Sequence, residues 1–137
     1  LPASGTYTIL VDPPLNATGT STIAAYDVPP DVTGSLTINA AALPVSIAAP
    51  GHKVLLTVTA TAGQQVTVRF TGNTIGTVDG NPFFGLQRPD GSWQTYTFTG
   101  ASAFDLSPQT LAAGTFTVWV DAVGVNVGAV SVQVTSP

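Results

Sequence analysis

Hydrophobic and polar residues alternate along most of the chain, a pattern typical of strands that bury one face. The stretch "TFTVWV" places Phe116, Val118 and Val120 on one face and Thr117 and Trp119 on the other. We predict strands wherever such alternation recurs, at 6–11, 36–38, 44–47, 53–60, 65–70, 83–87, 93–98, 115–120 and 128–134. No stretch has helical periodicity, so the pattern predicts an all-β, antiparallel β-sandwich with almost no helix.

The sequence of one predicted pair of strands occurs twice in the chain, in similar form. Residues 5–12 read "GTYTILVD" and residues 114–121 read "GTFTVWVD", and each copy is followed by a loop that ends in glycine, Gly19 or Gly128. The two glycines are offset by 128 − 19 = 109 residues, and the copies begin at the same offset, 114 − 5 = 109. Self-similarity at a fixed offset indicates an array of repeats, cut here one hairpin upstream of a full unit.

The repeat divides the chain into three parts. Residues 1–27 are predicted to be the terminal β-hairpin of a preceding unit, and residues 35–137 the β-sandwich module. Between them, residues 28–34 form a connector. Its Pro29–Pro30 pair favours extended geometry and cannot donate ladder hydrogen bonds, so we expect this connector to be stiff.

An extra hairpin has no obvious place in a module that already contains its equivalent. A two-stranded hairpin is marginal alone in water, and this one would expose an apolar face made of Tyr7, Ile9 and Val11. We expect these residues to mediate association with another copy by strand addition, giving a dimer or a fibre. The alternatives are packing against the outer edge of its own sandwich, or fraying.

Three stretches carry a family resemblance: "TAGQQVTVRFTGNTIG" at 61–76, "RPDGSWQTYTF" at 88–98 and "GTFTVWVDAVGVNVGAVSVQV" at 114–134. They resemble the bacterial pre-peptidase C-terminal domain, closest to its tandem form in large secreted or surface proteins of bacteria. Residues 1–34 are similar to the junction between two such repeats. The resemblance implies a secreted, jelly-roll-like β-sandwich that accompanies another domain and has no activity of its own. Some relatives carry calcium or bind polysaccharide or protein.

The composition limits the possible binding partners and the cellular location of the protein. Charged residues make up 7% of the chain, against about 25% in ordinary globular domains, and the net charge is −4. One lysine and two arginines form no basic patch, which argues against nucleic acid and anionic membranes as partners. No apolar run reaches the roughly 20 residues of a membrane span. The absence of cysteine suits a secreted or surface protein of bacterial origin, which is the localisation we expect.

The chain offers little for catalysis. His52 is its only histidine, and no carboxylate lies near it in sequence to orient it as a general base. We interpret His52 as a surface residue of the "APGHKV" turn. No nucleophile-elbow motif accompanies the many serines, so we expect the protein not to be an enzyme.

Two small groups of residues are candidates for binding. Asp79 and Asn81 cluster oxygen donors in the turn "TVDGNP", where calcium is the cofactor that they would suit; a plain turn is the alternative. Trp93, Tyr96 and Trp119 are aromatic residues that could stack on a sugar. The competing interpretation is packing. Phe70, Phe116 and one of Trp93 or Tyr96 are expected to fill the sandwich, and Trp119 is out of phase with its buried neighbours.

Taken together, these features predict a non-catalytic extracellular structural or adhesion module whose partners are copies of itself or neighbouring repeats. The alternative is a carbohydrate-binding module that accompanies a secreted enzyme and binds polysaccharide.

Overall fold

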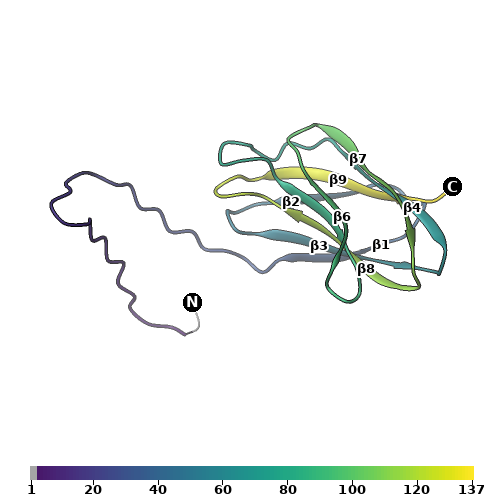
Figure 1. The fold of residues 1–137 in the computed structure, drawn as a ribbon, viewed down its shortest axis with the longest axis horizontal. Coiled ribbons are helices and arrows are strands. Elements are labelled where there is room, and N and C mark those ends of the chain that lie inside the picture. The colour runs from purple at the N-terminus through teal and green to yellow at the C-terminus, as the bar shows by residue number, and fades with distance from the viewer. Residues whose placement is uncertain (1–2) are drawn as a thin grey trace.

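The structure is a computed structural model that describes residues 3–137, and its sandwich consists of two packed β-sheets (Figure 1). The first sheet has the order β1 (Val32–Leu36), β3 (Lys53–Ala60), β8 (Gly114–Asp121), β5 (Phe83–Gln87) and β6 (Trp93–Phe98). The second has the order β2 (Leu43–Ile47), β9 (Gly128–Thr135), β4 (Gln64–Thr71) and β7 (Ala103–Leu111). The predicted all-β sandwich is therefore confirmed, with no helix in residues 3–137 and hence none long and apolar enough to cross a membrane.

The pairing is antiparallel except in one place. Strand β1 runs parallel to β3, with Val32 opposite Val54 and Leu36 opposite Val58. It begins at Val32, inside the range 28–34 assigned to the connector, and replaces the strand expected at 36–38. Parallel neighbours need a crossover connection, which is here supplied by β2 in the opposite sheet. Local alternation carries no information about strand direction, so the sequence could not reveal this pair.

Alternation places the core between the sheets. Inward-facing side chains of β3, β4, β5, β8 and β9 are almost fully buried. Three phenylalanine rings join the two layers: Phe84 of the first sheet lies 4.9 Å from Phe70 and 4.7 Å from Phe104 of the second, centroid to centroid. The core thus contains Phe70 and Phe116 as expected, but Phe84 and Phe104 fill the space that was assigned to Trp93 or Tyr96.

Strand β7 was not predicted, and its composition explains why. Its sequence "AFDLSPQTL" contains Pro108 and does not alternate cleanly. It is an edge strand, and its pairing with β4 shifts register between the partners of Val66 and Val68, which are Gln109 and Leu106. Pro108 lies in this irregularity, where a missing N–H does not interrupt a regular ladder.

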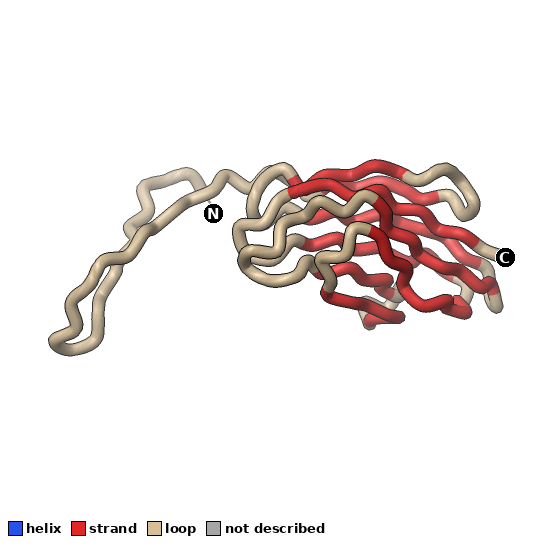
Figure 2. The backbone as a smooth tube through the Cα atoms, turned by 90° about the horizontal axis from the view of Figure 1, so that it is seen from above, coloured by secondary structure: helices blue, strands red, loops and turns tan. Residues whose placement is uncertain are grey.

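Residues 3–27, which we call the arm, lie outside the sandwich. No strand occurs in this segment; two limbs join at a turn and extend away from the sheets (Figures 1 and 2). The turn is closed by a hydrogen bond from the Ala17 N–H to the Pro14 carbonyl (3.1 Å), with Leu15 at φ 53°. Tyr7, Ile9 and Val11 are 48%, 67% and 58% exposed. The arm therefore has the apolar face that the sequence predicted, without a ladder between its limbs.

Candidate functional site

Five aromatic side chains gather on the outer face of the first sheet, and we call them the outer aromatic cluster. They come from the three neighbouring strands β8, β5 and β6: Phe83, Trp93, Tyr96, Phe98 and Trp119. Register places them side by side, since Phe83 lies opposite Phe98 and Gly85 lies opposite both Tyr96 and Trp119. The structure thus brings together Trp93, Tyr96 and Trp119, the three residues that the sequence singled out for binding.

The rings of this cluster pack mainly edge to face. Trp93 makes such contacts with Phe83 (4.8 Å between centroids) and with Trp119 (5.6 Å). Tyr96 and Phe98 stand at the margin on edge strand β6, and each is 56% exposed. Most ring faces are therefore covered by other rings, and the free aromatic surface lies at the β6 edge.

Gly85 makes this packing possible. A Cβ atom at this position would lie 2.8 Å from ring atoms of both Phe83 and Trp93, closer than side chains tolerate. The absence of a side chain lets the two rings close over the backbone of β5, where glycine is otherwise unfavourable. This glycine is the signal that sequence reasoning missed: a glycine inside a strand, two residues after the aromatic Phe83, indicates a close approach of side chains.

Polar groups fix the inner end of the cluster. The Trp119 indole N–H donates to Oε1 of Gln87 (3.0 Å). Lys53 Nζ lies 5.5 Å from the Trp119 ring centroid and 3.2 Å from Oδ2 of Asp121. A shallow depression of about 530 Å³ opens here, lined in part by Phe83, Phe98 and Lys53. An apolar floor beside one cation and one anion can accept a flat, neutral or weakly polar group.

The proposed calcium turn is held by the protein itself. Oδ2 of Asp79 accepts a hydrogen bond from the Val125 N–H (2.8 Å), and the Asn126 side chain bridges the same two loops. Asp79 and Asn81 are both exposed. In residues 3–137, no three His, Cys, Asp or Glu side chains come together as metal ligands. Calcium at Asp79 and Asn81 stays a prediction.

His52 is not the surface residue that we expected. It is 5% exposed, and in the turn before β3 its Nδ1 accepts a weak hydrogen bond from the Ala48 N–H (3.4 Å). Its Nε2 is buried and has no hydrogen-bond partner among the described residues. The imidazole is thus removed from solvent and from the aromatic cluster.

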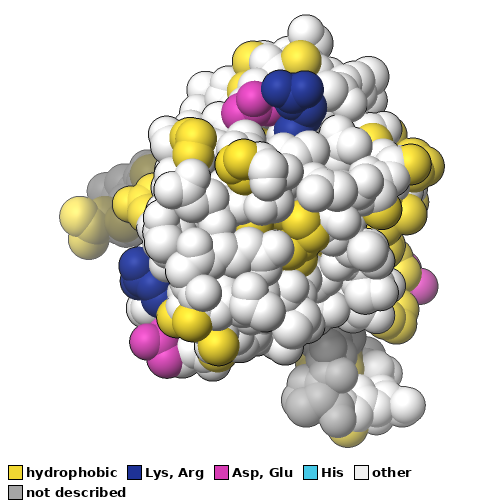
Figure 3. All heavy atoms as spheres, turned by 90° about the vertical axis from the view of Figure 1, so that its right-hand side faces the viewer, with side chains coloured by type: hydrophobic (Ala, Val, Ile, Leu, Met, Phe, Trp, Pro, Cys, Tyr) yellow, Lys and Arg dark blue, Asp and Glu magenta, His cyan; other side chains and the backbone are white. Residues whose placement is uncertain are grey.

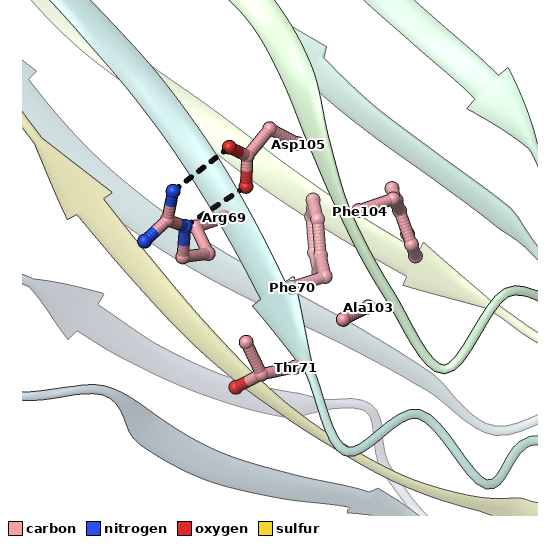
Figure 4. A pocket seen from close by; sticks show the side chains of 6 residues that line it. All are labelled: Arg69, Phe70, Thr71, Ala103, Phe104 and Asp105. Atoms are coloured by element: carbon pink, nitrogen blue, oxygen red, sulfur yellow. Dashed lines mark hydrogen bonds and ion pairs between the residues drawn. The ribbon is translucent and has the colours of Figure 1, made fainter.

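Charged side chains are few, and two ion pairs occur among residues 3–137, Lys53–Asp121 and Arg69–Asp105. Arg69 and Asp105 lie opposite each other on β4 and β7 and form a bidentate ion pair with N–O distances of 3.0 and 3.1 Å (Figure 4). The hydrogen bonds to Asp105 and its negative charge raise the pKa of Arg69 above its ordinary value. Figure 3 shows how sparse the charges are at the carboxyl-terminal end of the molecule, where a few basic and acidic side chains, some of them side by side, lie on a mostly uncharged surface. Such pairs support strand register rather than chemistry.

Comparison with solved structures identifies the fold. The chain is similar to the pre-peptidase C-terminal domain of a collagenase from Bacillus anthracis, at TM-score 0.62 and 12% identity over 77% of this chain and 97% of that domain. It is also similar to PliG of Aeromonas hydrophila, a periplasmic inhibitor of g-type lysozyme, at TM-score 0.50 and 19% identity over 76% of this chain and 98% of PliG. No protein-family model and no curated protein matches the sequence. The sandwich has the fold of the pre-peptidase C-terminal domain, which confirms the sequence resemblance at the level of fold.

Proposed function

We propose that this chain is a non-catalytic structural module of an extracellular protein, and that its arm joins it to a neighbouring sandwich. One observation carries the proposal. The arm holds a strand-forming sequence whose apolar side chains are exposed, while the sandwich already contains strands of that sequence. Burying such a face requires a surface outside its own sandwich.

The side-chain chemistry supports a non-catalytic role. The single imidazole is buried, and no His, Cys, Asp or Glu cluster occurs in the part of the chain that the structure describes. The acid–base pairs Arg69–Asp105 and Lys53–Asp121 join adjacent strands. The periplasmic setting of PliG and the lack of cysteine support a place outside the cytoplasm.

Deleting residues 1–27 tests the role of the arm. Because the arm does not complete its own core, we expect the shortened chain to melt within about 2 °C of the full chain. If the arm links complete sandwiches by edge addition, light scattering should show dimers or larger assemblies for the full chain and monomers for the shortened chain. A shortened chain that is unfolded or clearly less stable would show that the arm belongs to its own sandwich, and the proposal would fail.

Carbohydrate binding is the second candidate, and the outer aromatic cluster favours it. Tyr96 and Phe98 present exposed rings at an edge strand beside a shallow depression, an arrangement that suits stacking on a sugar ring. The chain contains two tryptophans, and both belong to the cluster, so intrinsic tryptophan fluorescence reports on this site alone. A titration with soluble polysaccharides should change the emission of the native chain, and Tyr96→Ala should weaken the response. Unchanged emission with every polysaccharide would remove this candidate.

A further inference from the structure

The arm repeats not only the sequence of β8 and β9 but also the geometry of the loop between them. In the arm, the Ala17 N–H donates to the Pro14 carbonyl (3.1 Å). In the sandwich, the Asn126 N–H donates to the Val123 carbonyl (3.2 Å). Both partners are displaced by the repeat offset, 126 − 17 = 123 − 14 = 109. The arm therefore holds the β8–β9 loop conformation without the sheets around it.

The backbone dihedral angles support the same correspondence. Leu15 has φ 53° and Gly124, which lies 124 − 15 = 109 residues further on, has φ 62°. Residues other than glycine rarely adopt positive φ. A leucine that keeps this conformation at the matching position indicates that the turn is an element of the repeat.

In the sandwich, β8 and β9 do not pair with each other. Strand β8 lies between β3 and β5 in the first sheet, and β9 lies between β2 and β4 in the second. Two limbs that match strands of opposite sheets are not built to form a hairpin, which accounts for the absence of a ladder in the arm. Each limb instead requires two flanking strands.

The buried positions of β8 have apolar counterparts in the arm. Phe116, Val118 and Val120 are at most 1% exposed, and they correspond to Tyr7, Ile9 and Val11. In the second limb, Gly19 corresponds to Gly128, and Ile23 corresponds to Val132 at the fully buried centre of β9. The first limb therefore has the apolar side chains needed to occupy a sandwich interior, whereas the second has one large apolar residue, with Ser21 and Ala25 at the positions of buried Val130 and Val134.

Its own sandwich cannot receive the arm. Strands β8 and β9 already fill these positions, and the chain between arm and sandwich is too short. Strand β1 starts at the end where β8 finishes, since Val32 pairs with Val54 and Val54 with Val120. An arm limb in the place of β9 would finish at Tyr26, the counterpart of Thr135, at the opposite end about 25 Å away, whereas residues 27–31 span about 20 Å at most.

We propose that the arm supplies the β8 and β9 strands of a second sandwich, built on another copy of the β1–β7 framework, residues 32–113. This inference rests on the proposed structural function and specifies how modules are joined. Each sandwich would be completed by two strands that continue directly into β1 of the next unit. The units would then follow one another end to end, since the end of β9 and the start of β1 lie at opposite ends of a sandwich.

The test is a fusion in which residues 32–113 precede residues 5–137, so that residue 113 is followed by Gly5 as it is normally followed by Gly114. The second sandwich is unchanged and serves as an internal standard. We expect amides of residues 6–11 to exchange with solvent at least about a hundredfold more slowly than in the unfused chain, because they become part of a sheet interior. Arm amides that exchange equally fast in both proteins would overturn the proposal.

A pair of substitutions checks that the protection arises from strand replacement. In the fusion, Ile9→Asp places a charge at the position of buried Val118 and should return the arm amides to fast exchange, with the second sandwich still protected. Thr8→Asp, at the position of outward-facing Thr117, should preserve the protection. Equal effects of the two substitutions would mean that the arm docks on an outer surface. This result would refute strand replacement and leave the deletion test of the proposed function unaffected.

Discussion

Single residues decide how the outer face of the first sheet is packed. Gly85 is the clearest case, since the rings of Phe83 and Trp93 occupy the space that any side chain would need. Exposed aromatic residues would otherwise be free to rotate, and here they are ordered by contact with one another. The order of the cluster therefore depends on a residue that contributes no side chain.

Gly85→Ala should destabilise the sandwich by about 1–3 kcal/mol, because the added methyl group forces the two rings apart. Chemical denaturation followed by tryptophan fluorescence measures both the loss and the disturbance of Trp93. Gly5→Ala is the matched control, since nothing lies within 4 Å of a Cβ atom at that position. Equal stability of the Gly85→Ala and Gly5→Ala variants would show that the cluster is loosely packed.

Asp90 gives a pH-dependent prediction in the turn between β5 and β6. Hydrogen bonds from the Ser92 hydroxyl (2.7 Å) and the Ser92 N–H (2.9 Å) lower the pKa of this carboxylate below its ordinary value of 3.8. A lowered folded-state pKa stabilises the fold above the unfolded pKa, and this contribution is lost as the pH falls through the folded value. An NMR titration should place the Asp90 midpoint below 3.8 and show that Ser92→Ala raises it. A midpoint that Ser92→Ala leaves unchanged would contradict the role of the hydroxyl.

Among the elements of the fold, two segments of similar sequence lie in different environments. The "GTFTVWVD" strand is interior to a sheet, and the "GTYTILVD" limb is in solvent. Alternation of apolar and polar residues makes a segment suitable for a β-strand. The segment becomes part of a sheet only where neighbouring strands are present. The two copies have the same alternation of apolar and polar residues, and they differ in whether neighbouring strands flank them.

This difference can be measured with equivalent substitutions. Phe116→Ala should lower the free energy of unfolding by about 3–5 kcal/mol, since it empties a fully buried site in β8. Tyr7→Ala, at the equivalent position of the arm, should change it by less than about 0.5 kcal/mol. Urea denaturation of the two variants makes the comparison. A large loss for Tyr7→Ala would show that the arm packs on its own sandwich.

For the whole molecule, the sandwich and the arm predict an elongated particle. A compact chain of 137 residues has a radius of gyration of about 14 Å, and the extended arm should raise the value for this protein clearly above that. Small-angle X-ray scattering of the full chain and of the chain without residues 1–27 measures the difference. Similar maximum dimensions for the two proteins would mean that the arm folds back onto the sheets.

Most local features of this protein could be predicted from its amino-acid sequence. Alternation located most strands, the low charge and lack of helix periodicity predicted the fold class, and the offset repeat revealed the arm with its apolar face. It also selected Trp93, Tyr96 and Trp119, which meet in one cluster. The strands can be located from neighbouring residues, because a strand with one buried face repeats its apolar positions every two residues. The arm can be located because its sequence resembles that of residues 114–121.

Which strands are neighbours became clear from the three-dimensional arrangement of the sheets. In the structure, β1 runs parallel to β3, the proline-containing β7 is an edge strand, and β8 and β9 lie in different sheets. The structure also buries His52 and has Phe84 and Phe104 in the core in place of Trp93 or Tyr96. The physical reason is that alternation distinguishes two faces of a strand but does not say which face meets the opposite sheet. That choice depends on pairing and packing between residues far apart in the chain.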